Sequence, residues 1–180
     1  MEIKLSLDVD KKIIDNIINE KAYGRLGHLG THIDIMDKSF PLEYLKRKAI
    51  VFKLKDYKEI DLKDIDINRV EEDSIILFYT GQLDRYGYGT KEYNKDHPIL
   101  SYELIDYLIF KKISLIGIDF PGLRRGLEHT PIDAYLSDNG IFVIENMVNI
   151  DKLPLECVVN IKPIKHGGSS GLPCVVIAKV

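Results

Sequence analysis

Three side chains that commonly bind metal ions lie close together near the start of the chain. His28, His32 and Asp34 have the spacing H-x-x-x-H-x-D, and two glycines, Gly27 and Gly30, are interleaved with them. Imidazole nitrogens and carboxylate oxygens are ligands for both Zn²⁺ and Mn²⁺. The stretch therefore indicates a site for one or two divalent metal ions. The alternative is a polar hairpin edge that carries two unrelated histidines.

The glycines decide which backbone can carry this stretch. Two histidines at i and i+4 would share a helix face, but the glycines and β-branched Thr31 disfavour a helix. On an extended strand, alternate side chains share a face, which puts the Cα atoms of His32 and Asp34 about 7 Å apart. His28 would lie about 13 Å from His32 on a straight strand, so we expect a bend at Gly30 to bring it in.

Further acidic and imidazole side chains occur in the second half of the chain. One apolar run ends in Glu145, and a carboxylate there is expected to be paired or to bind an ion. His129 and Asp133 are four residues apart at the start of an expected helix, so they would share one face. Any of the three could transfer protons at a metal site, although His129 could simply cap the helix and Asp133 could be a surface carboxylate. Asp119 follows another apolar run and is expected to be a structural hydrogen-bond acceptor.

The elements that must position these side chains alternate between strands and helices. Three long apolar runs, residues 74–80, 113–118 and 141–145, are typical of strands buried on both faces. A strand-helix-strand order predicts parallel pairing through a crossover connection, and such sheets place their sites at the carboxyl ends of the strands. We therefore expect an α/β fold in one domain, residues 1–180. The expected strands are 1–7, 49–54, 74–80, 113–118, 141–145, 157–163 and 173–180; the expected helices follow Asp10, cover 42–48, begin at Ser101 and cover 129–137.

Two loops have compositions that bear on function. Residues 84–96 are polar and rich in Tyr and Gly, which indicates either an active-site flap or a mobile surface loop. Tyr86 and Tyr88 would pack on a substrate in the first case. Residues 166–171 form a Gly- and Ser-rich loop that lacks the strand-turn-helix context of a phosphate-binding loop.

Composition excludes several classes of partner. The 180 residues carry a net charge of −3, with a pI near 6.0, which gives no reason to expect nucleic acid or an anionic membrane as partner. No apolar run reaches the ~18 residues of a membrane helix and no signal-peptide pattern is present, so a cytoplasmic location is expected. Cys157 and Cys174 lie in apolar surroundings without C-x-x-C spacing and are expected to be buried and free.

The stretch G-H-L-G-T-H-I-D resembles the signature H-x-G-T-H-x-D of the metal-dependent cyclase family, which includes bacterial kynurenine formamidases (arylformamidases) and isatin hydrolases. Further segments that resemble the family follow in its order: 78–81, 98–101, 116–119, 140–146 and 171–178. The resemblance implies a swivelling β/β/α fold with a mixed sheet and a divalent metal ion. It also implies hydrolysis of a C–N bond in a small amide, formamide, cyclic imide or lactam.

The resemblance also assigns residues. His28, His32 and Asp34 match the family's first three metal ligands, and Glu145 matches its late ligand. The family usually has a further His soon after the Asp, which is absent here. It also has a His about twelve positions before the late Glu, where this chain has Asp133, with His129 one helical turn earlier. We therefore take Asp133, His129 and Glu145 as the candidate catalytic residues.

Four further residues are predicted to contact a small-molecule substrate: Lys38, Phe40, Gln82 and Tyr86. Lys38 or Asp37 stands near the position of the family's further His, and Lys38 would bind an anionic part of the substrate or else be a solvated lysine. The sequence thus predicts a hydrolase with Zn or Mn as cofactor. The alternative is a family member that has lost catalysis and binds a metal or a small molecule. A homodimer is expected because the family's members are commonly dimeric.

Overall fold

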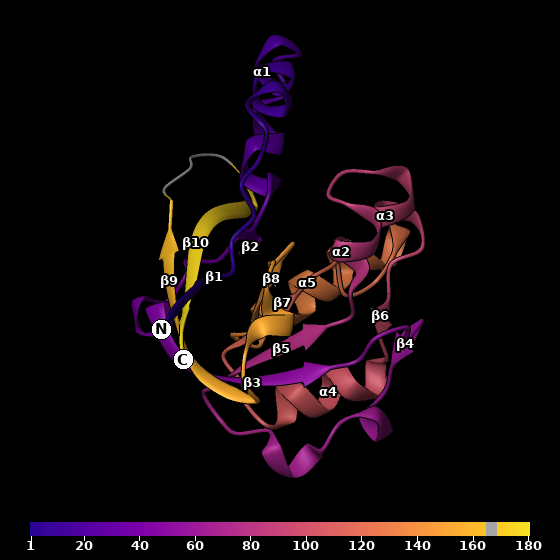
Figure 1. Cartoon of the computed structure of the whole chain (residues 1–180), viewed down its shortest axis with the longest axis vertical. Helices are drawn as coiled ribbons and strands as arrows, with labels where there is room; N and C mark the ends of the chain where they lie inside the picture. The colour runs from indigo at the N-terminus through magenta and orange to yellow at the C-terminus, as the bar shows by residue number, and fades with distance from the viewer. Residues whose placement is uncertain (165–168) are drawn as a thin grey trace.

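A mixed sheet contains strands from both ends of the chain and curls until its edges meet (Figure 1). The computed structural model describes residues 1–164 and 169–180. The strand order is β1-β10-β2-β8-β7-β5-β3-β9, and β9 also pairs with β10, so that the seven strands from β10 to β9 form a closed, barrel-like wall. These strands are β1 (Glu2–Lys4), β2 (His32–Asp34), β3 (Lys46–Lys53), β5 (Ile75–Tyr79), β7 (Leu115–Ile118), β8 (Phe142–Glu145), β9 (Glu156–Pro163) and β10 (Gly171–Lys179).

Parallel and antiparallel pairing are both present in this wall. The pairs β3–β5, β5–β7 and β7–β8 are parallel, whereas β2 pairs antiparallel with both β8 and β10, and β9 with both β3 and β10. Helix α4 (Tyr102–Phe110) lies between β5 and β7 in the chain, and helix α5 (His129–Asp138) lies between β7 and β8. The predicted α/β class with a mixed sheet is therefore confirmed, as is the parallel pairing of the two strands that flank α4.

The remaining elements are short. Helix α1 (Lys11–Asn19) stands away from the sheet at one end of the molecule (Figure 1). Strands β4 (Glu59–Ile60) and β6 (Ile99–Leu100) pair in a small separate sheet. The other helices are α2 (Gln82–Tyr86) and α3 (Lys91–Lys95), and the 3-10 turns are η1 (Tyr23–His28), η2 (Leu42–Leu45), η3 (Leu62–Asp64), η4 (Ile67–Arg69), η5 (Gly126–Glu128) and η6 (Ile150–Lys152).

The apolar strands are buried on both faces, which explains their continuous hydrophobicity. All five residues of β5 are buried: Ile76 and Phe78 belong to an apolar cluster that includes residues of α4 and α5, and Ile75 and Leu77 belong to a second cluster. This alternation follows the two-residue period of a strand. The second cluster takes residues from strands all round the wall, for example Ile33 and Val176, and thus fills the space that the sheet encloses.

Several local predictions are confirmed. The side chain of Asp10 accepts a hydrogen bond from the backbone N–H of Lys12 and caps α1. The hydroxyl of Ser101 accepts from the backbone N–H of Leu104 and caps α4. Cys157 and Cys174 are buried and free. In the part of the chain that the structure describes, no helix is long and apolar enough to cross a membrane.

Three local predictions need correction. The ligand stretch is not one bent strand: His28 ends the 3-10 turn η1, and β2 begins only at His32. The expected helix 42–48 stops at Leu45, because the chain from Lys46 onward pairs with β9. Residues 84–96 are not a loop, since α2 and α3 occupy most of this segment. Of the loop predicted over residues 166–171, residues 166–168 lie outside the described part of the chain.

Candidate metal centre

A left-handed backbone bend at Gly30 separates the two histidines of the motif. Gly30 has φ +64°, a conformation that glycine adopts without strain. Its carbonyl oxygen accepts hydrogen bonds from His32 Nδ1 and Asn146 Nδ2, both at 2.9 Å, and its N–H donates to the Tyr88 hydroxyl at 2.8 Å. Because a carbonyl can only accept, His32 donates through its Nδ1–H, so Nε2 faces the cluster and is the atom that could bind a metal ion. The bend expected at Gly30 is confirmed.

The ring nitrogens and the first carboxylate converge on one another. His28 Nδ1 lies 3.2 Å from His32 Nε2 and 3.1 Å from Asp34 Oδ1, and His32 Nε2 lies 3.5 Å from Asp34 Oδ1. Ligands bonded at about 2.0–2.2 Å around a tetrahedral or octahedral ion stand roughly 2.8–3.6 Å apart. The three atoms therefore have the separations that one metal ion requires. The second nitrogen of His28, Nε2, lies 3.0 Å from Ser170 Oγ, which orients the ring.

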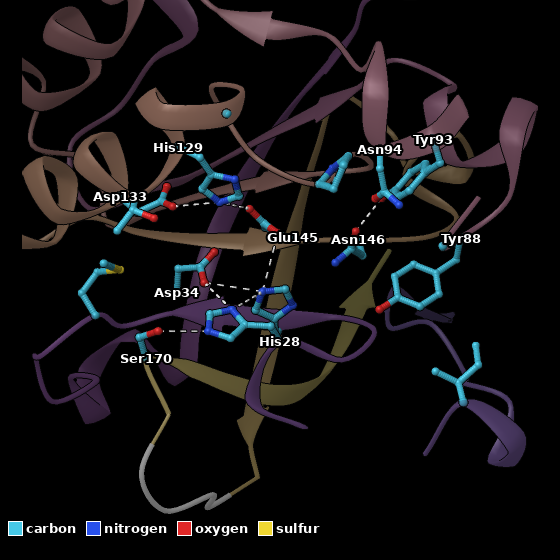
Figure 2. Close-up of a pocket in the computed structure, with 17 residues that line it drawn as sticks. His28, Asp34, Tyr88, Tyr93, Asn94, His129, Asp133, Glu145, Asn146 and Ser170 are labelled. Atoms are coloured by element: carbon cyan, nitrogen blue, oxygen red, sulfur yellow. Dashed lines mark hydrogen bonds and ion pairs between the residues drawn. The ribbon is translucent and has the colours of Figure 1, made fainter. Parts of the chain in front are cut away.

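Glu145 joins this group through the sheet. It ends β8 and is paired in register with His32, the first residue of β2. Its side chain is 5% exposed, and Oε2 lies 3.5 Å from His32 Nε2. The acid at the end of an apolar strand is thus explained, because its carboxylate pairs with the imidazole directly opposite on the neighbouring strand (Figure 2).

A second group of ligand-type atoms lies on the other side of Glu145. His129 Nε2 is 3.0 Å from Asp133 Oδ2 and 3.3 Å from Glu145 Oε1, and atoms of Asp34 belong to the same group within 4.8 Å. His129 and Asp133 both point toward the cluster from the first turns of α5 (Figure 2). Asp133 is 3% exposed, so it is not a surface carboxylate.

A glycine makes room for the His129 ring. A Cβ at Gly122 would lie 2.7 Å from His129 Cε1 and 2.8 Å from Nδ1, and Gly122 has φ +131°. The imidazole thus packs directly on the backbone of the turn that follows β7.

Several buried oxygens in the cluster have no hydrogen-bond partner in the described residues. They are Asp34 Oδ2, Asp133 Oδ1 and Glu145 Oε1; the last is near His129 but without hydrogen-bond geometry. Buried carboxylate oxygens are costly unless they are paired, hydrogen-bonded or bound to a cation. Three carboxylates with unsatisfied oxygens, next to imidazole nitrogens, therefore fit a divalent metal ion.

Burial and mutual proximity shift the pKa values of the carboxylates and of His129 in the cluster. Burial and the neighbouring charge of Asp34 raise the pKa of Glu145 to about 7, and burial raises the pKa of Asp133 to about 6. Asp133 and Glu145 together raise the pKa of His129 to about 11. Burial would raise the pKa of Asp34, but its two histidine neighbours outweigh that effect and lower it. A cation among these oxygens would favour their charged forms.

The cluster forms part of the wall of a cavity of about 710 Å³. Of the described residues that line it, none is Lys or Arg, and its basic side chains are the three histidines of the ligand groups. Besides the ligand-type residues, the wall has an apolar and aromatic part, which is Ile13, Met36, Tyr88, Tyr93 and Pro121, and a polar part, which includes Asn94, Thr130, Asn146 and Ser170 (Figure 2).

The residues predicted to contact substrate lie elsewhere. Lys38 pairs with Asp138 at 2.7 Å, and Phe40 packs edge-on against Phe142. Gln82 is buried and donates to the carbonyl of Tyr93 at 3.1 Å, while Tyr86 is 39% exposed. The structure places none of the four among the residues lining the cavity.

Other residues of the site carried little signal in the sequence. Asn146 follows Glu145 directly, and its amide supports the Gly30 carbonyl. Tyr93 is fully buried and donates to Asn146 Oδ1 at 2.5 Å. Adjacency to Glu145 could have indicated Asn146, whereas only the three-dimensional pairing shows that Tyr93 and Ser170 belong to this site.

Comparison with known proteins identifies the family. The family described as "Putative cyclase" matches residues 3–124, which is more than half of the chain. The chain therefore belongs to the cyclase family. The match includes His28, His32 and Asp34 but ends before His129, Asp133 and Glu145, so the membership of these three in the site rests on the structure.

Solved structures with the same fold include hydrolases. Isatin hydrolase A from Labrenzia aggregata is 23% identical, with a TM-score of 0.71 over 84% of this chain and 73% of that chain. A potential metal-dependent hydrolase with cyclase activity is 20% identical, with a TM-score of 0.76 over 99% of this chain and 96% of that chain. A predicted metal-dependent hydrolase from Bacillus stearothermophilus is 21% identical, with a TM-score of 0.69 over 99% and 86%. A comparison with curated protein sequences gives no match.

Proposed function

We propose that this protein is a divalent-metal-dependent hydrolase that cleaves the C–N bond of a small amide, formamide, cyclic imide or lactam. The observation that carries the proposal is the convergence of His28 Nδ1, His32 Nε2 and Asp34 Oδ1 at mutual distances of 3.1–3.5 Å. These residues would hold the ion, with Glu145 within reach as a fourth ligand. Two imidazoles and carboxylates suit Zn²⁺ or Mn²⁺.

The chemistry divides between the ion and the protein. A bound divalent ion supplies Lewis acidity, which polarises a carbonyl group and lowers the pKa of water. His129, which Asp133 and Glu145 keep protonated, would donate a proton to the leaving nitrogen, because its Nε2 faces the cluster between these two carboxylates. Asp133, whose pKa is raised to about 6, would take a proton from the attacking water and pass it to the imidazole. Asp133 would orient the imidazole, and Asn146 with Gly30 would hold His32 in the tautomer that leaves Nε2 free.

The number of ions bears on the role of His129. Asp34 belongs to both groups of ligand-type atoms, and each of Asp34 and Glu145 has one oxygen near the first group and one unpartnered oxygen. If a second ion binds, the second group would be its ligands, and His129 would be a ligand rather than a proton carrier. Metal stoichiometry distinguishes the two arrangements.

The cavity wall favours uncharged substrates. Lys38 was predicted to bind an anionic part of the substrate, but it is paired with Asp138 and does not line the cavity. With three carboxylates and no lysine or arginine among the described lining residues, a neutral amide, imide or lactam fits better than an anion.

The test combines metal analysis with a substrate panel. The purified chain, loaded with Zn²⁺ or Mn²⁺, is assayed on formanilide, isatin and phthalimide, beside His32→Ala and the control His97→Gln. His97 is also buried but is held by the Pro98 carbonyl, outside the ligand groups. We expect His32→Ala to lose metal and activity and the control to keep both. Bound metal without hydrolysis of any panel member, and an effect of His32→Ala on stability alone, would favour the alternative of a metal-binding family member without catalysis.

A further inference from the structure

Two tyrosines of the segment that contains α2 and α3 reach the metal centre, and they use their hydroxyls differently. Tyr93 is fully buried, and its hydroxyl donates to Asn146 Oδ1 at 2.5 Å. Tyr88 is half-buried, and its hydroxyl oxygen accepts from the Gly30 N–H at 2.8 Å. The phenol of Tyr93 therefore donates its proton within the protein, whereas the known contact of Tyr88 is one in which it accepts.

The proton of the Tyr88 hydroxyl remains available. A phenol has one proton to donate and can accept from a donor such as Gly30 N–H at the same time. Among the residues that the structure describes, none accepts a hydrogen bond from this hydroxyl. Burial raises the pKa of Tyr88, so the group keeps its proton at neutral pH.

The hydroxyl lies beside the ligand cluster. Tyr88 lines the same cavity as His28, His32 and Asp34. Its hydroxyl oxygen accepts a hydrogen bond from the N–H of Gly30, and the carbonyl of the same glycine accepts a hydrogen bond from His32. Gly30 thus connects the phenol to a proposed metal ligand. In Figure 2 the Tyr88 ring projects into the site from the side opposite Asp133, with its oxygen toward the cluster.

We propose that Tyr88 donates its phenolic hydrogen bond to the carbonyl oxygen of the bound amide and is a catalytic and specificity-determining residue of this chain. The inference rests on the proposed hydrolase function. When water adds to the carbonyl carbon, the new C–O bond forms and negative charge develops on the carbonyl oxygen. The C–N bond then breaks, and one proton of the water ends on the leaving nitrogen. A fixed donor at the carbonyl oxygen stabilises the charged species more than the neutral substrate.

The experiment removes this donor and leaves the ring. Tyr88→Phe and the control Tyr102→Phe are compared with the wild type as full-length, zinc-loaded protein; Tyr102 is 49% exposed, on α4. Measurements are kcat and KM on the best substrate among formanilide, isatin and phthalimide, the equilibrium affinity for isatin, and zinc affinity by competition with a chromophoric chelator. We expect Tyr88→Phe to lower kcat by about 10²–10³-fold with a smaller change in KM, as for loss of one oxyanion donor. Zinc affinity should stay within about threefold, and a site-specific 3-fluorotyrosine at position 88 should restore most of the rate.

The outcomes separate this inference from the function on which it rests. If the wild type hydrolyses a panel member and Tyr88→Phe is as fast at saturating zinc, Tyr88 only supports the Gly30 bend and the inference is wrong. If the wild type binds isatin without hydrolysing any panel member and Tyr88→Phe weakens binding about fivefold or more, the donor is right and the hydrolase function is wrong. If the wild type neither binds nor hydrolyses any of them, both are wrong.

Discussion

Gly171 offers a direct test of the metal centre, because it touches a ligand without being one. It begins β10, pairs in register with Asp34, and packs against the end of η1. A Cβ at this position would lie 2.7 Å from His28 Nδ1 and 2.6 Å from the Gly27 carbonyl oxygen. Carbon atoms of real side chains essentially never approach closer than 3.0 Å, so Gly171→Ala must move the imidazole, the turn, or both.

The size of the effect follows from these distances. The His28 nitrogen must retreat by at least 3.0 − 2.7 = 0.3 Å. Metal–ligand distances vary by only about 0.2 Å around their ordinary values, so the displaced nitrogen no longer completes the triad. We expect the affinity for Zn²⁺ to fall about 10–100-fold, the range typical of changes that misplace a ligand. Overpacking should also lower the free energy of unfolding by about 1–3 kcal/mol.

The assay is competition for Zn²⁺ with a chromophoric chelator, beside urea unfolding in the presence of EDTA. Gly24→Ala is the matched control, since Gly24 lies in the same 3-10 turn, has no positive φ, and its added Cβ would meet nothing within 4 Å. A Gly171→Ala protein that is folded and binds Zn²⁺ as tightly as the control would show that His28 is not a ligand. The proposal that His28, His32 and Asp34 bind one metal ion would then be wrong.

Three further predictions concern other parts of the structure. Burial lowers the pKa of His97 from 6.5 to about 4, so its contribution to stability is present above pH 6.5 and is lost as the pH falls toward 4; between pH 7 and pH 5 the wild type should lose about 2 kcal/mol more than His97→Gln, measured by urea unfolding. Gly122→Ala should lower kcat about 10–100-fold, because the new Cβ would lie 2.7 Å from His129 Cε1 and displace the imidazole; unchanged steady-state kinetics would exclude a role for this ring in the reaction. Thr80→Val removes the hydroxyl that donates to Asp119 at 2.8 Å and should lower the free energy of unfolding by about 1.5–3 kcal/mol, with zinc affinity unchanged as the control measurement.

The parts of the fold that the sequence predicted are those with a strong local cause. The uninterrupted apolar runs became strands buried on both faces, and Asp10 and Ser101 cap the helices that follow them. Asp119 is the structural acceptor that was expected, since it accepts hydrogen bonds from Thr80 and Gly81. The convergence of His28, His32 and Asp34 and the bend at Gly30 were also predicted, because both depend on spacing within seven residues.

The rest could not be predicted because it depends on contacts between distant segments. Both His129 and Asp133 face the cluster, a result that helical spacing allowed but could not establish. Tyr86 and Tyr88 were both predicted to pack on a substrate, but only Tyr88 lines the cavity, whereas Tyr86 is exposed, since the direction of each side chain depends on where α2 ends. Lys38 has Asp138 as its partner, one hundred residues away, which local sequence could not indicate.

The length of β2 has a consequence for how this protein opens. Of the seven strands in the closed wall, β2 is the shortest, with three residues, yet it alone joins β8 to β10. Two of those residues, His32 and Asp34, are ligands in our proposal. A bound ion would therefore link this shortest strand of the barrel to Glu145 on β8 and to His28. Amide hydrogens of β2 should then exchange with solvent markedly more slowly once Zn²⁺ is added, while those of β5, which pairs with β3 and β7 and carries none of the proposed ligands, should barely respond. Metal binding would then stabilise the barrel against local opening at β2, where the wall has its shortest strand.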